Sequence, residues 1–373
     1  MMNILIDIGH PAHVHYYRNL AIELEKKGHR VLWTVKEIDI AKRLLDFYGF
    51  KYIVLPKKSD SIFGKIWKQL LFDLIIFKIC IQKKIDLAIG SSVSIVHVSK
   101  ISRVKSIVFD DDDDDVQPLV TKYVNPYADY LLSPEALKGK RKRKDTIYYS
   151  GYHELAYLHP KRFKPDINVL AEAGILPDTP YFVMRFNVFK AHHDKGISGL
   201  SLNQKLQLIE ILKPYGKIFI TTEREIEPQL KQYQIKISPL KMHSLMYFST
   251  MFLGDSQTMT SEAAVLGVPS LRCNSFAGRI SYLEEEEHKY KLTYAFKPEN
   301  FSEMIFKLKE LLEIKDLKAE WEKRKINMLK DKIDFREKLN FQVFNTHLQK
   351  CVQYLTPVNY INYLLGQKKI DLA

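Results

Sequence analysis

Three histidines, His10, His13 and His15, lie within six consecutive residues near the start of the chain. They follow the apolar segment 3–8, at the point where a helical pattern begins. Imidazole has an ordinary pKa of about 6.5, so near neutral pH it can accept a proton, bind a metal or hydrogen-bond to the backbone. These residue types alone leave three predictions open: a metal site, a general base, or a loop that orients a ligand.

Six consecutive aspartates, residues 110–115, follow the apolar segment 106–109. Adjacent carboxylates repel one another, so some of them are expected to hold a proton more tightly than usual. For most of the six we predict a solvated loop and the N-cap of the next helix. Asp110, Asp111 and Asp112 are candidates for a catalytic base, because they come at the carboxyl end of an expected strand. A divalent cation bound by the run is an alternative.

The segment around Gly254 has the residue types of a phosphate and ribose site. A strand is predicted to end there, and Asp255, Ser256 and Thr258 lead into a helical pattern. Ser256 or Thr258 can cap that helix, and the free N–H groups at a helix start favour a phosphate. Glu262 follows in the first turns, where it can accept hydrogen bonds from both hydroxyls of a ribose. The alternative is an ordinary helix cap with a solvent-facing glutamate.

Further candidates follow two other expected strands of the second half. Arg185 comes near the end of the strand 181–186, where its planar guanidinium can bind a diphosphate. Thr222 and Glu223 come at the end of the strand 217–222 and are predicted to orient the nucleotide. A histidine-rich loop with Lys190, His192, His193 and Asp194 follows Arg185. We predict that it contacts substrate, and the alternative is a surface loop held by local hydrogen bonds. The residues predicted to contact substrate are Lys190, His192, His193, Asp194, Tyr152 and His153.

The elements that must position these residues alternate along the chain. Short β-rich segments are separated by helix-length segments, which indicates parallel strands joined by crossover helices. The pattern runs twice, so we predict an α/β protein of two Rossmann-like domains, residues 1–160 and 161–340, that face each other across a cleft. Helices at about 340–373 are expected to pack back on the first domain. The expected strands are residues 3–8, 30–35, 52–56, 86–90, 106–110, 181–186, 217–222, 251–255 and 269–273.

The composition is that of a globular protein, with 46% hydrophobic and 27% charged residues. The three cysteines form neither a disulfide framework nor a zinc pattern, so we expect a cytoplasmic location. A net charge of +13 favours anionic partners, but no nucleic-acid-binding motif is present and nucleic acid is not a predicted partner. The basic run 138–144 is interpreted as a solvated loop, with a functional patch as the alternative.

The segment 62–84 is apolar but is interrupted by lysines and one aspartate, which argues against a membrane-spanning helix. We predict a core helix. The alternative is a surface helix whose tryptophan, phenylalanine and lysine content suits peripheral contact with the inner face of the membrane, where it would meet a lipid-linked acceptor.

The stretch "KMHSLMYFSTMFLGDSQTMTSEAAVLGVPSL" resembles the nucleotide-sugar segment of GT-B glycosyltransferases, such as the N-acetylglucosaminyltransferase that completes lipid II. Non-hydrolysing UDP-sugar 2-epimerases share this fold and a related turn, and in them a carboxylate after the strand equivalent to 106–110 does acid–base work. The residues matched by this resemblance are Met242 and His243 in the base-side loop, Ser256, Gln257 and Thr258 in the phosphate turn, and Glu262 as the ribose acid.

The opening of the chain is similar to the opening of the same transferases, where a glycine-rich turn ends in His-Val before the first helix. His13 and Val14 match that pair, but Pro11 replaces a second glycine and stiffens the turn. Over roughly residues 3–280 the chain also resembles a family known as domain of unknown function 354, whose members look like GT-B proteins. The motifs that carry this resemblance include "IDIGHPAHVHYYRNL", "SIVFDDDDDD" and "RFNVFKAHHDKGISGLS".

The resemblance implies a glycosyltransferase of the cell envelope that moves a sugar from a nucleotide sugar, with a UDP-sugar as the expected donor, to a surface polysaccharide or glycolipid. The second domain would hold the donor, and His13, His10 or an aspartate from 110–112 would deprotonate the acceptor. GT-B enzymes generally need no bound metal, so neither a metal nor a cofactor is expected. The alternatives are a non-hydrolysing nucleotide-sugar 2-epimerase and a non-catalytic sugar-nucleotide-binding protein.

Overall fold

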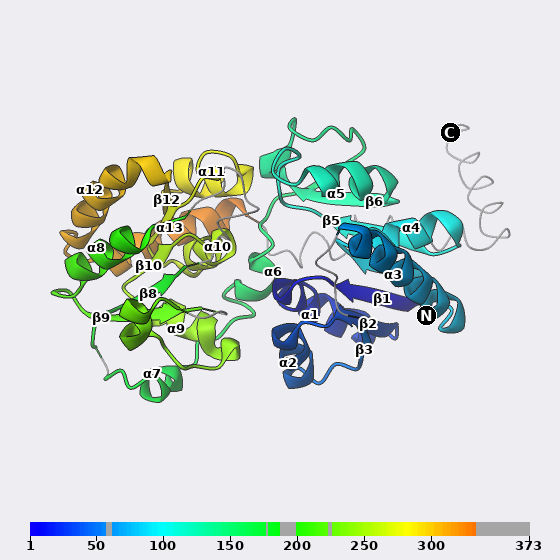
Figure 1. Ribbon diagram of the computed structural model, residues 1–373, viewed down its shortest axis with the longest axis horizontal. Helices are drawn as coiled ribbons and strands as arrows, with labels where there is room; N and C mark the ends of the chain where they lie inside the picture. Colours follow the sequence, from blue (N-terminus) through cyan, green and yellow to red (C-terminus); the bar gives the residue numbers. More distant parts are fainter. Residues whose placement is uncertain (57–61, 177, 187–198, 223–225, 333–373) are drawn as a thin grey trace, which may run out of the picture.

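The computed structural model has two separate parallel β-sheets, each covered by helices, and the two domains lie side by side (Figure 1). It describes residues 1–373 with the exception of 57–61, 177, 187–198, 223–225 and 333–373, and for residues 62–66 it describes the backbone alone. The helices expected at about 340–373 therefore lie outside the described residues.

The first sheet has seven strands in the order β3-β2-β1-β4-β5-β6-β7, and all of its pairings are parallel. The chain builds outward from β1 to β3 and then returns to the other side of β1, so a switch point lies between β1 and β4. The strands are β1 (Asn3–Ile8), β2 (Arg30–Lys36), β3 (Tyr52–Leu55), β4 (Leu87–Gly90), β5 (Lys105–Phe109), β6 (Tyr130–Pro134) and β7 (Ile147–Tyr149).

Helices cover both faces of this sheet, because alternate residues of its strands point to opposite sides. Ile4 and Ile6 of β1 pack in one core with α1 and α2, whereas Leu5 packs in a second core with α3 and α4. The helices of this domain are α1 (Pro11–Lys26), α2 (Asp39–Phe47), α3 (Ile62–Gln82), α4 (Val93–Ile101) and α5 (Pro118–Tyr123), with short 3-10 turns η1 (Asn125–Tyr127) and η2 (Glu135–Leu137).

The second sheet has five parallel strands in the order β12-β11-β10-β8-β9. Its strands are β8 (Tyr181–Arg185), β9 (Lys217–Thr221), β10 (Met251–Gly254), β11 (Ser270–Cys273) and β12 (Thr293–Phe296). Its helices are α7 (Asn168–Glu172), α8 (Leu202–Leu212), α9 (Met242–Phe248), α10 (Gln257–Leu266), α11 (Ser281–His288), α12 (Phe301–Leu312) and α13 (Leu317–Asp331), with 3-10 turns η3 (Pro228–Tyr233), η4 (Pro239–Lys241) and η5 (Pro298–Asn300).

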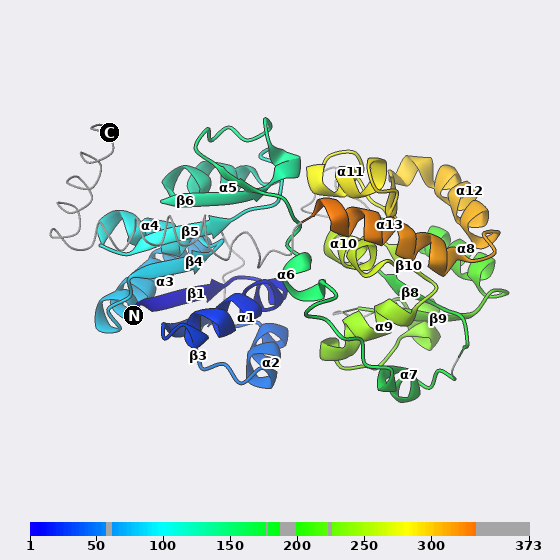
Figure 2. The ribbon, with the colours of Figure 1, turned by 180° about the vertical axis from the view of Figure 1, so that it is seen from behind.

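Helix α10 lies in the interior of the second domain, and every residue from Met259 to Leu266 is buried. It contacts α9, α11 and α13, and the last of these crosses it in the view from behind (Figure 2). Trp321 anchors α13, because its buried indole N–H donates to the carbonyl of Leu292 at 2.8 Å. Helix α10 is therefore packed among neighbouring helices of the domain.

A short helix, α6 (Leu155–Leu158), connects the domains and contacts both α1 and α10. Its four residues are buried in the core of the second sheet, while the Asn19 amide of α1 donates to the Ala156 carbonyl at 2.7 Å. The junction therefore has packed contacts on both sides. The domain boundary expected near residue 160 stays a prediction.

The predicted two-domain α/β architecture is confirmed, and each of the nine expected strands forms. Three further strands, β6, β7 and β12, were not predicted from the sequence. β7 and β12 are edge strands of three and four residues that are only partly buried, so their apolar pattern is short. None of the described helices is long and apolar enough to cross a membrane.

Candidate active site

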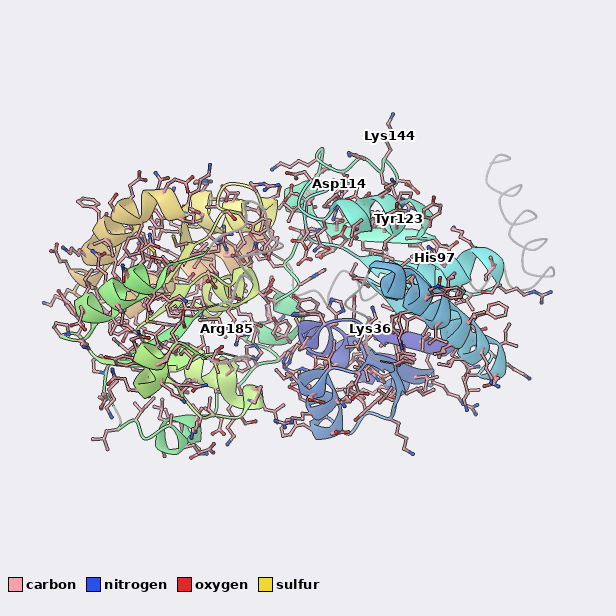
Figure 3. All side chains as sticks on the ribbon, in the orientation of Figure 1. Lys36, His97, Asp114, Tyr123, Lys144 and Arg185 are labelled. Carbon is pink, nitrogen blue, oxygen red and sulfur yellow. The ribbon has the colours of Figure 1, made fainter. Side chains whose placement is uncertain are left out.

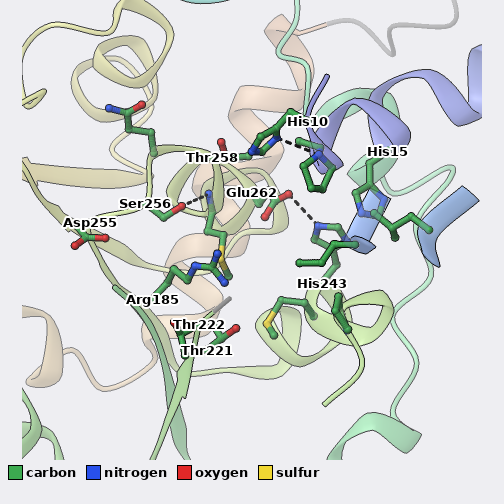
Figure 4. A pocket seen from close by; sticks show the side chains of 18 of the residues that line it. His10, His15, Arg185, Thr221, Thr222, His243, Asp255, Ser256, Thr258 and Glu262 are labelled. Atoms are coloured by element: carbon green, nitrogen blue, oxygen red, sulfur yellow. Dashed lines mark hydrogen bonds and ion pairs between the residues drawn. The ribbon is translucent and has the colours of Figure 1, made fainter. Parts of the chain in front are cut away.

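A cavity of about 560 Å³ lies between the two domains (Figure 4). The carboxyl ends of β8 and β10 point into it from the second domain, which is where parallel sheets place their ligand sites. The first domain lines it with His10, Pro11, Ala12, His15, Ile40, Arg43 and Leu44. The second domain lines it with Arg185, Thr221, Thr222, Ile235, Ile237, Pro239, Met242, His243, Asp255, Ser256, Gln257, Thr258, Met259, Glu262, Asn274 and Phe276.

The wall formed by the second domain is built around the start of α10. Gly254 is required at the end of β10, because a β-carbon there would collide with the backbone carbonyl of Arg185 on the neighbouring strand. Ser256 is the N-cap of α10, and its hydroxyl accepts a hydrogen bond from the Met259 N–H at 3.4 Å. The helix start therefore faces the cavity with free N–H groups and partial positive charge, an arrangement that suits an anion.

Arg185 ends β8 beside this helix start, and its guanidinium lies between the Ser256 and Thr222 side chains (Figure 4). Thr222 follows β9, and Met242 begins α9. The predicted nucleotide-sugar residues Arg185, Ser256, Thr222 and Met242 therefore come from four different elements. The cavity next to Met242 has an apolar lining of Ile235, Ile237 and Pro239. A cationic group and an apolar area thus lie in one cavity, which suits an amphiphilic ligand with a phosphate and a flat base.

Glu262 is buried and lines the cavity, so the alternative of a solvent-facing glutamate is wrong. The Tyr157 hydroxyl donates to its Oε1 at 2.7 Å, and the Nε2 atom of His243 lies 2.9 Å from the same oxygen. The ring of His15 stacks on Tyr157 with centroids 5.3 Å apart and meets His243 edge-on at 4.9 Å. Helices α1, α6, α9 and α10 together hold the carboxylate in one orientation.

The opening histidines are distributed around the start of α1. His10 is its exposed N-cap, and Nδ1 of its ring accepts the Ala12 N–H at 3.3 Å, while Pro11 occupies the first turn, where its fixed φ is suited to a helix. His15 is buried and lines the cavity. His13 lies behind this wall and does not line the cavity.

His13 is surrounded by protein, and its ring contacts Tyr16 and Tyr17. Burial lowers the pKa of His13 to about 3, and the nearby His10 and His153 act in the same direction. The ring is therefore neutral at physiological pH. Its Nδ1 accepts the Gly9 N–H at 3.4 Å, so the proton of the neutral ring lies on Nε2.

The aspartate run is packed between the domains, and the prediction of a mostly solvated loop is wrong. Asp110 forms a buried ion pair with Arg141 at 3.0 Å and accepts the Asn125 amide at 2.7 Å. Arg141 also binds Asp114 at 2.8 Å. The reason is that the run is enclosed by groups from later in the chain, which supply the charge and the N–H donors that the sequence near residues 110–115 lacks.

The same run contacts the second domain through the start of α11. Asp113 is buried and accepts the backbone N–H of Ser281 at 2.6 Å and its hydroxyl at 2.5 Å. Asp115 lies 3.2 Å from Arg279. One carboxylate thus caps a helix of the other domain, and a neighbouring one makes an exposed ion pair beside it.

Asp111 and Asp112 are the members of the run with the strongest acid–base character. The Oδ2 atom of Asp111 lies 2.9 Å from Nδ1 of His153, a residue that we predicted to contact substrate. Burial, together with the charges of Asp111 and Asp110, raises the pKa of Asp112 to about 7, although Gln117 donates a hydrogen bond to its carboxylate. Proton exchange near neutral pH is therefore within reach of this cluster.

The three aspartates 110–112 have ligand atoms within 4.8 Å of one another, a spacing that a metal ion could bridge. Arg141 already neutralises Asp110, and His153 lies against Asp111. The divalent-cation alternative stays a prediction, as does the expectation that no metal is needed.

The basic run 138–144 has two kinds of residue. Arg141 is buried in the ion pairs described above, and the Arg143 guanidinium donates to the carbonyls of Asn125 and Ala128 at 2.6 and 2.8 Å. Lys144, in contrast, extends from the loop into solvent (Figure 3). The solvated-loop interpretation is therefore wrong for the two arginines, which fasten this loop to the first domain.

Some predicted residues are not placed at the cavity. Tyr152 is fully buried, and its hydroxyl donates to Glu285 at 2.8 Å, while His153 belongs to the aspartate cluster. Lys190, His192, His193, Asp194 and Glu223 lie outside the described residues. Three further residues have no local signal in the sequence, because their roles depend on contacts between distant segments. Arg43 and Asn274 line the cavity, and Tyr157 holds the Glu262 carboxylate.

Comparisons with known proteins agree with this architecture. An uncharacterized protein of Methanocaldococcus jannaschii is 24% identical over 305 residues, which cover 77% of this chain and 86% of that protein. The UDP-GlcNAc 2-epimerase of the same organism, solved in complex with UDP-GlcNAc and UDP, superimposes with a TM-score of 0.63 at 15% identity, over 87% of this chain and 99% of that one.

A glycosyltransferase gives a similar result. CalG4, the calicheamicin glycosyltransferase, has a TM-score of 0.53 at 12% identity, over 96% of this chain and 100% of that one. With two parallel-sheet domains facing each other, these likenesses show that the chain has the GT-B fold. The family model described as "Protein of unknown function (DUF354)" matches residues 2–335, and the chain belongs to this family.

Proposed function

We propose that the protein binds a nucleotide sugar in the cavity between its domains and transfers the sugar to a polysaccharide or glycolipid acceptor. The observation that carries this proposal is the convergence of three groups on one cavity: the Arg185 guanidinium, the open start of α10 at Ser256, and the oriented carboxylate of Glu262. A diphosphate, a ribose and a base have complementary groups there. A UDP-sugar is the donor proposed first, because the epimerase with the similar fold was solved with UDP-GlcNAc and UDP.

In this reaction an acceptor oxygen bonds to the anomeric carbon as the bond to the leaving diphosphate breaks. Arg185 and the N–H groups of α10 would stabilise the negative charge that develops on the diphosphate. Glu262 would fix the ribose, since Tyr157 and His243 already hold its Oε1. The proton of the acceptor hydroxyl must pass to a base on the first-domain side.

The structure favours a carboxylate over a histidine as that base. The Nδ1 atoms of His10 and His13 both accept backbone N–H groups, so their Nε2 atoms carry protons and act as donors when the rings are neutral. The pKa of Asp112, raised to about 7 chiefly by burial, is close to the value that favours a general base at neutral pH. In this proposal His10, which lines the cavity, donates a hydrogen bond to the substrate. His13 positions the turn behind it through the Gly9 N–H, and a carboxylate from 110–112 takes the proton.

The first test measures donor binding. Thermal shift with UDP-, GDP-, CMP- and dTDP-sugars should identify one class that raises the apparent stability, because ligands stabilise the folded state by mass action. Glu262→Ala should abolish the shift, and Glu262→Gln should weaken it less, since the amide oxygen can still accept from Tyr157. Glu303→Ala, an exposed residue of α12, is the control. Equal shifts in all four proteins would contradict the proposed site.

The second candidate is a non-hydrolysing 2-epimerase. It is supported by the TM-score of 0.63 to an epimerase against 0.53 to a glycosyltransferase. Incubation of the bound UDP-sugar without an acceptor separates the two: an epimerised sugar identifies the epimerase, whereas an unchanged donor that is consumed when an envelope glycan extract is added identifies the transferase. In either case His13→Ala should keep donor binding and lower turnover, and unchanged turnover would exclude His13 from the reaction.

A further inference from the structure

Helix α3 has one buried face and one exposed apolar face. Phe72, Ile76, Ile79 and Cys80 pack in the core of the first domain. The opposite face carries large apolar side chains that are exposed by 39% to 74%, and Ile101 at the end of the adjacent α4 is exposed by 69%. The exposed apolar residues of α3 are Trp67, Leu70, Leu71, Leu74 and Ile81.

The spacing of these side chains places them on one stripe. Steps of three, four and seven residues from Trp67 lead to Leu70, Leu71 and Leu74, so their side chains share one side of the helix. Soluble proteins expose single apolar residues routinely. A contiguous apolar stripe on a helix, in contrast, commonly marks a surface that binds a membrane or another molecule.

Cations border this stripe at the far end of the two helices. Lys78, Lys83, Lys84 and Arg103 are exposed, and none of the four makes an ion pair with a described residue. The acid within α3, Asp73, lies 2.7 Å from His97 of α4, which is labelled beside α3 in Figure 3. The face therefore combines an apolar stripe with uncompensated positive charge, within a chain of net charge +13.

We propose that this face, defined as the exposed residues of α3 together with Ile101 and the four cations, binds the surface of an anionic membrane. The tryptophan and leucines would enter the boundary between headgroups and acyl chains, and the lysines and Arg103 would contact the phosphate groups. A second copy of the chain is a poorer occupant, because two such faces would bring their uncompensated cations together. An acidic, apolar lipid surface complements both properties of the face.

The first half of this helix lies toward the candidate active site. Phe72 packs below the ammonium group of Lys36, which is 5.5 Å from its ring centre and is the last residue of β2. The same ammonium group lies 4.0 Å from the position that a β-carbon on Gly9 would occupy, at the turn that precedes His10. Membrane attachment through α3 would therefore bring the acceptor side of the cavity near lipid. Given the proposed function, this geometry suits an acceptor carried on a lipid.

The test is flotation of the full chain with vesicles of phosphatidylcholine alone or of phosphatidylcholine with phosphatidylglycerol. We expect binding to the anionic vesicles that weakens as salt rises, because screening reduces the attraction of the lysines. Leu70→Glu combined with Leu74→Glu should lower the bound fraction at least about tenfold, because apolar burial is lost and like charge is added. Phe306→Glu on α12, where the native side chain is 72% exposed, is the matched control and should bind as the wild type does.

Three results would overturn the proposal. One is an absence of vesicle binding by the wild-type chain. Another is an equal loss of binding in Phe306→Glu. The third is a double variant that keeps vesicle binding but turns a wild-type dimer into a monomer, which would identify the face as a contact between copies.

The UDP-sugar thermal shift separates this proposal from the proposed function. The double variant should keep the wild-type shift, which also shows that it is folded. Vesicle binding by a chain that responds to no nucleotide sugar would leave the membrane face intact and remove the proposed function.

Discussion

Two polar regions of this protein have a similar position in the fold. One is the cavity wall at the ends of β8 and β10, and the other is the aspartate cluster at the end of β5. In both, polar side chains follow a parallel strand at its carboxyl end. At the cavity, Arg185, Ser256 and Glu262 line open space. In the cluster, Arg141 and Ser281 fill the space around Asp110, Asp113 and Asp114.

The difference shows that the end of a strand predicts where polar groups gather and does not predict whether a ligand can reach them. A buried carboxylate without a partner is costly, so the protein encloses the run with a buried arginine, an amide and a helix start. The cavity instead leaves its helix start and its guanidinium facing space. We therefore expect Asp110, Asp113 and Asp114 to govern stability and the cavity wall to govern binding. Asp111 and Asp112, which are less buried than Asp110 and Asp113, keep the proton-accepting role proposed above.

The largest expected effect is on the stability of the cluster. Arg141→Met removes the cation that Asp110 and Asp114 share and leaves two buried acids unpaired. Breaking a buried pair in this way costs about 3–5 kcal/mol of unfolding free energy, measurable by urea denaturation. Lys142→Ala, at an exposed neighbouring position, should change stability by less than about 0.5 kcal/mol. A stable Arg141→Met protein would show that the cluster is solvated in solution.

The second effect should be confined to binding. Arg185→Ala removes a guanidinium at the cavity and should weaken the affinity for the UDP-sugar roughly tenfold or more, since a hydrogen bond to a charged group contributes about 1.5–3 kcal/mol. Isothermal titration calorimetry measures this, with Lys231→Ala as an exposed control. A loss of stability as large as that of Arg141→Met, without a change in affinity, would show that Arg185 stabilises the fold and does not bind the ligand.

The smallest expected effect concerns pH. Burial, with repulsion by Asp111, raises the pKa of Asp112 to about 7 in the folded protein, against about 3.9 in an unfolded chain. Between these values the folded state holds a proton that the unfolded state has lost, so the contribution of Asp112 to stability falls as the pH rises through this window. Asp112→Asn should match the wild type near pH 4 and exceed it by about 1 kcal/mol at pH 8. This is below the roughly 4 kcal/mol that three pKa units correspond to, because Asp112 is partly exposed and solvent screens its charge.

Urea denaturation at pH 4, 6 and 8 measures this change, and Asp115→Asn is the control because Asp115 is exposed. A constant difference between Asp112→Asn and the wild type at all three values would mean that the carboxyl of Asp112 titrates normally.

Local patterns predicted much of the cavity wall from the sequence. Ser256 is the N-cap that the hydroxyl-rich turn indicated, Gly254 ends its strand, and Arg185 ends β8 as expected. These features were predictable because helix capping and strand alternation involve residues that lie within a few positions of one another in the sequence. The strand-end position of His10 and the aspartate run was predictable for the same reason.

Pairing across the chain was not predictable in this way. Asp113 meets Ser281 over 168 positions, and Tyr157 meets Glu262 over 105. The sequence by itself determined the order of strands and helices, the caps, and the residues that gather at the strand ends. The tertiary structure alone decided which of these became a cavity and which became a packed ion-pair cluster, because burial and charge compensation depend on segments that only the fold brings together.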